Sequence, residues 1–147
     1  MTTYLFNEAQ FDLPEISSLI DRSRQFLEIK TEDGSKISLV IARAPAKEDD
    51  VLRTVVENGI AEQRRLLRAF TVLSAKEREY NAMQGIEVRL RFIDKNEGPI
   101  YHHEYHTVFE DTRVGFHAIC AVARAEYCDA WMEAVLESVS LRQFATE

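Results

Sequence analysis

Apolar and polar residues alternate on both sides of a Glu-Asp-Gly-Ser turn between Gln25 and Ala44, and this pattern predicts a β-hairpin. A loop of Asp33, Gly34 and Ser35 places the strongly apolar side chains of both strands on one face, expected to be core: Leu27, Ile29, Ile37, Leu39 and Ile41. The opposite face is smaller and mixed, and it carries Arg24, Phe26, Glu28, Lys30, Ser38, Val40 and Ala42. Such a surface fits either a solvated sheet face or a contact surface for another chain.

The segment after the hairpin has the spacing of an amphipathic helix. The acidic run within Lys47 to Asp50 is expected to open it, because carboxylates are favourable at a helix N-terminus. One stripe then follows at helical spacing through Leu52, Val55, Val56, Gly59, Ile60, Gln63 and Leu67. A glycine costs a helix roughly 1 kcal/mol, so we expect a neighbouring backbone to approach closely at Gly59.

Four later segments show strand-like patterns and predict an antiparallel meander: Thr71 to Tyr80, Ile86 to Ile93, Ile100 to Phe109 and Val114 to Val122. Cys128 to Leu141 returns to helical spacing. Two short pieces near the start, Tyr4 to Phe6 and Phe11 to Leu13, are expected to run along a sheet edge. The predicted fold is therefore α+β, with an antiparallel β-sheet built from the N-terminal hairpin and the C-terminal meander and two main helices packed on one face.

Composition narrows the class of protein. A chain of 147 residues that is 46% hydrophobic fits one domain, residues 1–147. The net charge of -7 argues against a nucleic-acid partner, which would need a basic stripe. The first residues lack a basic start followed by an apolar run, and no segment has the apolar length of a membrane span. We therefore expect a cytoplasmic protein that does not itself insert into a membrane.

The sharpest chemical feature is the run from Tyr101 to His106. His102, Glu104 and His106 alternate onto one face of a strand, and a tight turn at Asp111-Thr112 would place His117 directly across from His106. Three histidines and a carboxylate are ligands that transition metals accept. If Lys95 to Gly98 form the preceding loop, however, Arg89 lies opposite Glu104 and Glu87 opposite His106, which are pairs typical of a solvated charged face. The charged face is the favoured interpretation, and the alternatives are a polar contact to a partner and a metal- or small-molecule-binding site.

Other catalytic motifs are missing from the sequence. It contains no glycine-rich phosphate loop, no nucleophile elbow and no Cys-X-X-Cys motif. We therefore expect no enzymatic activity and, on the favoured interpretation of the histidine cluster, no metal and no cofactor.

The N-terminal part of the chain carries a series of short patterns: Tyr4, Asn7-Glu8, Phe11 to Pro14, Asp21 to Ser23 and Ser38 to Arg43. In these residues it resembles the Eag chaperones of type VI secretion systems, which have a Mog1/PsbP-like fold. The order of hairpin, helix, meander and closing Trp131 helix, and the strand end at Thr107 to Glu110, are also similar.

This resemblance implies a homodimer that holds the N-terminal transmembrane helices of a PAAR- or Rhs-type effector before the effector is loaded on the secretion spike. The client-contacting strand positions of the family map onto Arg24, Phe26, Ser38 and Ala42, and Val40 lies among them. Two positions depart from the family pattern, since Arg24 replaces an apolar residue and Ala42 a hydroxyl. A plain interaction domain of the Mog1 type, which binds a folded partner, is a further alternative.

Overall fold

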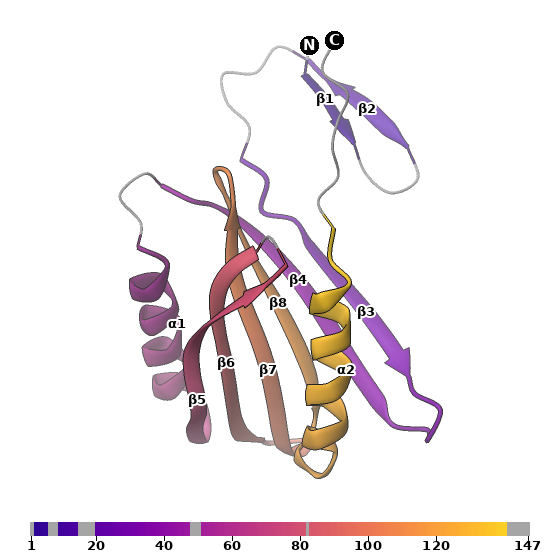
Figure 1. Cartoon of the computed structure of the whole chain (residues 1–147), viewed down its shortest axis with the longest axis vertical. Helices are drawn as coiled ribbons and strands as arrows, with labels where there is room; N and C mark the ends of the chain where they lie inside the picture. The colour runs from indigo at the N-terminus through magenta and orange to yellow at the C-terminus, as the bar shows by residue number, and fades with distance from the viewer. Residues whose placement is uncertain (1, 6–8, 15–19, 48–50, 82, 141–147) are drawn as a thin grey trace.

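The predicted hairpin and meander join edge to edge in one six-stranded antiparallel sheet with the order β3-β4-β8-β7-β6-β5 (Figure 1). The computed structural model describes residues 2–5, 9–14, 20–47, 51–81 and 83–140. Its elements are β1 (Thr2–Leu5), β2 (Gln10–Leu13), β3 (Arg24–Lys30), β4 (Lys36–Pro45), α1 (Leu52–Leu66), β5 (Arg68–Tyr80), β6 (Met83–Asp94), β7 (Gly98–Phe109), β8 (Thr112–Ala121), the 3-10 turn η1 (Val122–Arg124) and α2 (Ala125–Glu137). The α+β class is confirmed.

The two faces of the hairpin are divided as the sequence predicts. Leu27 pairs with Leu39 and Ile29 with Ile37, so these residues share a face, while Phe26 pairs with Val40 on the other. The loop spans residues 31–35 rather than the expected three, and it is closed by the Thr31 N–H, which donates to the Ser35 carbonyl at 2.9 Å. The longer loop moves the register by two residues, and an even shift keeps each side chain on its predicted face.

The register between β6 and β7 differs from the expected one. Asp94 pairs with Gly98, so the loop has three residues, and Gly98 takes a left-handed conformation with φ +78°. The Asp94 carboxylate accepts hydrogen bonds from the N–H groups of Asn96 and Glu97 at 2.8 and 2.9 Å, which fixes this turn. The shift is by one residue, and an odd shift exchanges the two faces.

The two helices cover opposite faces of the sheet, so the expectation that both pack on one face is wrong. Val56 of α1 lies against Ile86, Val88 and Leu90 of β6. Met132 of α2 instead belongs to a core that includes the odd-numbered residues of β7 and the even-numbered residues of β8. Figure 1 shows α2 in front of β7 and β8. We name the two sides the α1 face and the α2 face.

Helix α1 covers only one end of its face. It packs on β5, β6 and β7, and the part over β8, β4 and β3 stays open within the described residues. The described helix begins at Leu52, and the acidic residues 48–50 lie outside the described residues. Gly59 is exposed and a Cβ there would meet nothing within 4 Å, so the predicted close approach is wrong.

The first two strands form a small ribbon of their own. β1 pairs with β2 in antiparallel fashion, and together they make a separate two-stranded sheet rather than an edge of the large one. The expectation of a sheet-edge position for this segment is therefore wrong.

Candidate functional site

A row of directly paired residues crosses the α1 face from the open edge to the helix. Phe26 pairs with Val40, Val40 with His117, His117 with Glu104, and Glu104 with Val88. Directly paired residues of a sheet project on the same side. Two further rows flank it, one on each side. The first consists of Glu28, Ser38, Ile119, His102 and Leu90, and the second of Arg24, Ala42, Gly115, His106 and Ile86. The predicted contact residues and the histidine cluster therefore belong to one continuous surface.

Exposure falls steadily along the central row. Phe26 on the edge strand is 70% exposed. The His117 side chain is 23% exposed and that of Glu104 only 4%, while Val88 is fully buried beneath α1. The surface thus has an open apolar end on β3 and β4 and a recessed polar end on β7 and β8.

All five predicted contact residues lie at the open end. Arg24 and Phe26 come from β3, and Ser38, Val40 and Ala42 come from β4. The sequence did not predict that Gly115 and Ile119 of β8 belong to this surface, where they continue the two flanking rows. Their place follows from the pairing of β4 with β8, which joins residues that are 67 to 81 positions apart in the sequence, and no local pattern predicts that pairing.

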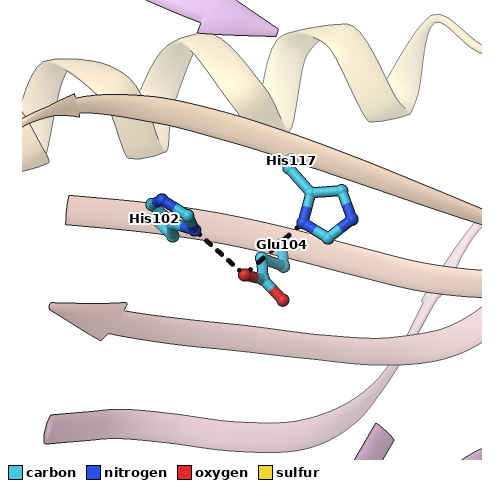
Figure 2. A group of neighbouring side chains, drawn as sticks. All are labelled: His102, Glu104 and His117. Carbon is cyan, nitrogen blue, oxygen red and sulfur yellow. Dashed lines mark hydrogen bonds and ion pairs between the residues drawn. The ribbon is translucent and has the colours of Figure 1, made fainter. Parts of the chain in front are cut away.

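The histidine cluster is centred on the Glu104 carboxylate (Figure 2). Glu104 Oε2 lies 3.1 Å from His102 Nδ1 and 3.4 Å from His117 Nδ1, and Oε1 lies 3.0 Å from His106 Nε2. His117 is paired with Glu104, not with His106 as expected, because the last hairpin pairs Phe109 with Thr112. This change is again an even shift, so the four residues stay together on one face.

The solvated charged face expected for these residues is not found. Val88 rather than Arg89 lies opposite Glu104, and Ile86 rather than Glu87 lies opposite His106. Glu104 is instead a buried carboxylate surrounded by imidazole rings and apolar side chains. The cause is the odd register shift at Gly98.

Hydrogen bonds keep the buried Glu104 carboxylate ionised. Burial alone would raise the pKa of Glu104, but hydrogen bonds from His102, His106 and His117 outweigh burial and hold the pKa well below its usual value. Each imidazole can therefore donate one N–H to this carboxylate and keep its second ring nitrogen for another partner.

Gly115 makes room for the histidine rings. A Cβ at this position would lie 2.8 Å from His117 Nε2 and 3.3 Å from His106 Nδ1. The two rings meet edge to face with their centroids 5.2 Å apart. Any side chain at position 115 would force these rings to move, so the glycine belongs to the cluster.

A second buried polar network lies on the α2 face, and sequence reasoning missed it. The Tyr80 hydroxyl donates to Glu87 Oε2 at 2.7 Å. His103 has its Nε2 3.3 Å from Glu87 Oε2 and its Nδ1 2.9 Å from Asp129 Oδ1. Burial raises the pKa of Glu87, but the adjacent His103 imidazole and the hydrogen bond from Tyr80 lower it to about 2. Because Asp129 belongs to α2, this network ties the helix to the sheet and has a structural role.

Solved structures share this architecture. PsbP (CyanoP) from Synechocystis sp. PCC 6803 is 10% identical, with a TM-score of 0.54 over 87% of this chain and 96% of that chain. LpqN of Mycobacterium tuberculosis, a protein involved in cell envelope biogenesis, is 8% identical, with a TM-score of 0.55 over 80% of this chain and 78% of that one. A protein of unknown function from Pseudomonas aeruginosa, PA94, is 13% identical, with a TM-score of 0.79 over 97% and 98% of the two chains. The molecule therefore has a PsbP-like fold, as the resemblance to Eag chaperones implies.

The family follows from the sequence itself. The family model DcrB matches residues 8–115, and the chain belongs to the DcrB family. No curated protein matches the chain. Within the described residues, neither α1 nor α2 is long and apolar enough to cross a bilayer.

Proposed function

We propose that this protein is a cytoplasmic chaperone and adaptor of a type VI secretion system. In this proposal it binds the N-terminal transmembrane helices of a PAAR- or Rhs-type effector and shields them until the effector is loaded on the spike. In this proposal the protein acts as a homodimer and has no enzymatic activity. The proposal builds on the resemblance to Eag chaperones, and the DcrB family and the PsbP-like fold are consistent with it.

The observation that carries the proposal is the open part of the α1 face. Phe26 is 70% exposed on edge strand β3, and its paired neighbour Val40 is only partly buried. Exposed apolar surface costs roughly 25 cal/mol per Å² in water. An apolar surface of this kind, rimmed by polar groups, favours a partner that brings apolar surface of its own.

The size of the side chains suits a helix as the partner. Membrane helices pack closely where small residues let backbones approach, and hydroxyl groups bond across such contacts. Ser38 and Ala42 lie on either side of Val40 on the α1 face of β4 and give a shallow surface with one hydroxyl. Phe26 stands beside them as an apolar ridge.

Two charged residues flank this surface on β3. Glu28 forms a 3.9 Å ion pair with Lys36, and both side chains are about three-quarters exposed. An ion pair so exposed contributes little free energy. Glu28 is therefore free to swing outward, and we assign it and Arg24 to the rim of the binding surface.

Co-expression with the neighbouring effector tests the proposal. The N-terminal region of the effector encoded beside this protein should be soluble and stable only when the protein is present. Phe26→Glu, Val40→Glu and Ser38→Asp should each abolish capture with little change in melting temperature, since all three residues lie at the open end.

The matched control is Leu27→Glu. Leu27 is the next residue on β3, is 49% exposed, and projects from the α2 face. This variant should keep the client. An effector region that is equally soluble without the protein contradicts the proposal, and a loss of folding in the Phe26 and Val40 variants would show that this surface is core.

A further inference from the structure

We propose that His102, Glu104 and His117 form a binding site for one divalent transition-metal ion at the recessed end of the α1 face. One ligand atom of each residue lies within 4.8 Å of the other two (Figure 2). This inference rests on the geometry of the cluster and is independent of the chaperone function.

The distances suit coordination. Zinc and related ions hold imidazole nitrogen and carboxylate oxygen at about 2.0–2.2 Å, so two ligand atoms of one ion lie about 3–3.5 Å apart. Glu104 Oε2 is 3.1 Å from His102 Nδ1 and 3.4 Å from His117 Nδ1. The two imidazole nitrogens lie within 4.8 Å of each other, so an ion that replaces the two shared protons requires the two rings to approach each other by up to about 1.5 Å.

The ligand set selects the class of ion. Two imidazoles and one carboxylate are the donors of zinc sites and of two-histidine-one-carboxylate iron sites. Mg²⁺ and Ca²⁺ prefer oxygen ligands and fit this site poorly. We therefore expect Zn²⁺, Co²⁺, Ni²⁺ or Fe²⁺ to bind here.

The framework around the three ligands is rigid and accessible. Glu104 and His102 lie on β7 and His117 on β8, two central strands of the sheet that are paired at Glu104 and His117. The His117 side chain, 23% exposed, gives solvent a path to the site. His106, 3.0 Å from the second Glu104 oxygen, orients the carboxylate and is within reach as a further ligand.

Gly115 supports the same interpretation. The absence of a Cβ lets His106 and His117 approach the carboxylate together, since a Cβ would lie 2.8 Å from a His117 ring nitrogen. Three imidazoles therefore converge on one buried carboxylate. The arrangement is what a metal site needs before the ion arrives.

The test uses the full chain without a histidine tag, stripped with EDTA and dialysed. Zn²⁺ is titrated by calorimetry, and Co²⁺ by its visible d–d absorption, which reports coordination directly. We expect one ion per chain and a Co²⁺ spectrum with nitrogen and oxygen ligands. Absence of stoichiometric binding of both ions would overturn the proposal.

Variants then locate the ion. His117→Gln and His102→Gln should each weaken Zn²⁺ binding at least 10-fold, and Glu104→Gln more. Because Glu104 is buried, circular dichroism checks its folding, and the more exposed His117 keeps the test valid if that variant unfolds. Glu28→Gln, an exposed carboxylate on the same face, is the control and should bind as the parent protein does. Unchanged binding in the double variant of His102 and His117 would place the ion elsewhere and refute the site.

Discussion

The exposed ring of Phe26 should contribute a calculable share of the free energy of client binding. A phenylalanine side chain presents about 200 Å² when fully exposed. With 70% of it exposed in the free protein, a client that covers the ring removes about 140 Å² from water. At roughly 25 cal/mol per Å², full coverage contributes about 3.5 kcal/mol and half coverage about 1.7 kcal/mol.

The perturbation is Phe26→Ala. It should weaken client binding by about 20-fold at half coverage and by about 300-fold at full coverage, because each 1.4 kcal/mol is a factor of ten. The melting temperature should barely change, since the ring makes little contact with the rest of the described chain.

The assay is a titration of the fluorescently labelled N-terminal region of the effector, held soluble by a carrier protein, in buffer without detergent. Leu27→Ala is the control, because Leu27 is 49% exposed and projects from the opposite face of the same strand. Light scattering on both variants checks that the oligomeric state is unchanged. Equal losses in both variants, or no loss for Phe26→Ala, would refute the assignment of binding to the α1 face.

Three further predictions concern folding and are read from thermal or denaturant unfolding. Gly115→Ala should destabilise the protein by about 1–3 kcal/mol through overpacking against His117, and a neutral result would contradict the close packing described. Gly59→Ala should raise the free energy of unfolding by up to about 1 kcal/mol, because alanine favours the helix and a Cβ at this exposed position meets nothing within 4 Å. The lowered pKa of Glu87, about 2 against a usual 4.5, stabilises the fold fully above about pH 4.5, and this stability is lost as the pH falls towards 2. Glu87→Gln should therefore reduce the loss of unfolding free energy between about pH 4.5 and pH 2. An unchanged loss would show that other carboxylates cause it.

The elements of this fold could be predicted from the sequence because each carries a local pattern. The hairpin of β3 and β4 even kept its predicted faces, although its loop is two residues longer than expected. An even error in register leaves Phe26 and Val40 on their face. The site residues on these strands were therefore grouped correctly from alternation alone.

The histidine cluster shows where local reasoning fails. A single residue of difference in the loop before Gly98 exchanged the faces of β7 relative to β6. The predicted partners Arg89 and Glu87 moved to the α2 face, and Glu104 became buried opposite Val88. Gly98, in a left-handed conformation at the start of β7, accompanies this register, and the alternation along the strands does not predict that conformation.

The placement of the helices depended on contacts distant in sequence. The sequence predicted that Glu87 and Arg89 face solvent, yet both lie beneath α2. There Glu87 is paired with His103 and Arg89 with Asp129. A buried charge is stable only with such partners, and Asp129 comes 42 residues after Glu87. The spacing of residues in the sequence does not contain these contacts. The prediction therefore placed both helices on one face of the sheet, whereas they cover opposite faces.

Site-specific photo-crosslinking tests directly whether the client binds the α1 face. A photoreactive residue is placed at Val40 on the α1 face or at Leu27 on the α2 face, and the protein is co-expressed with the neighbouring effector. We expect a crosslink from Val40 to the effector's N-terminal apolar segment and none from Leu27. A crosslink from Leu27 alone, or none from Val40 while the complex is intact, would contradict this expectation.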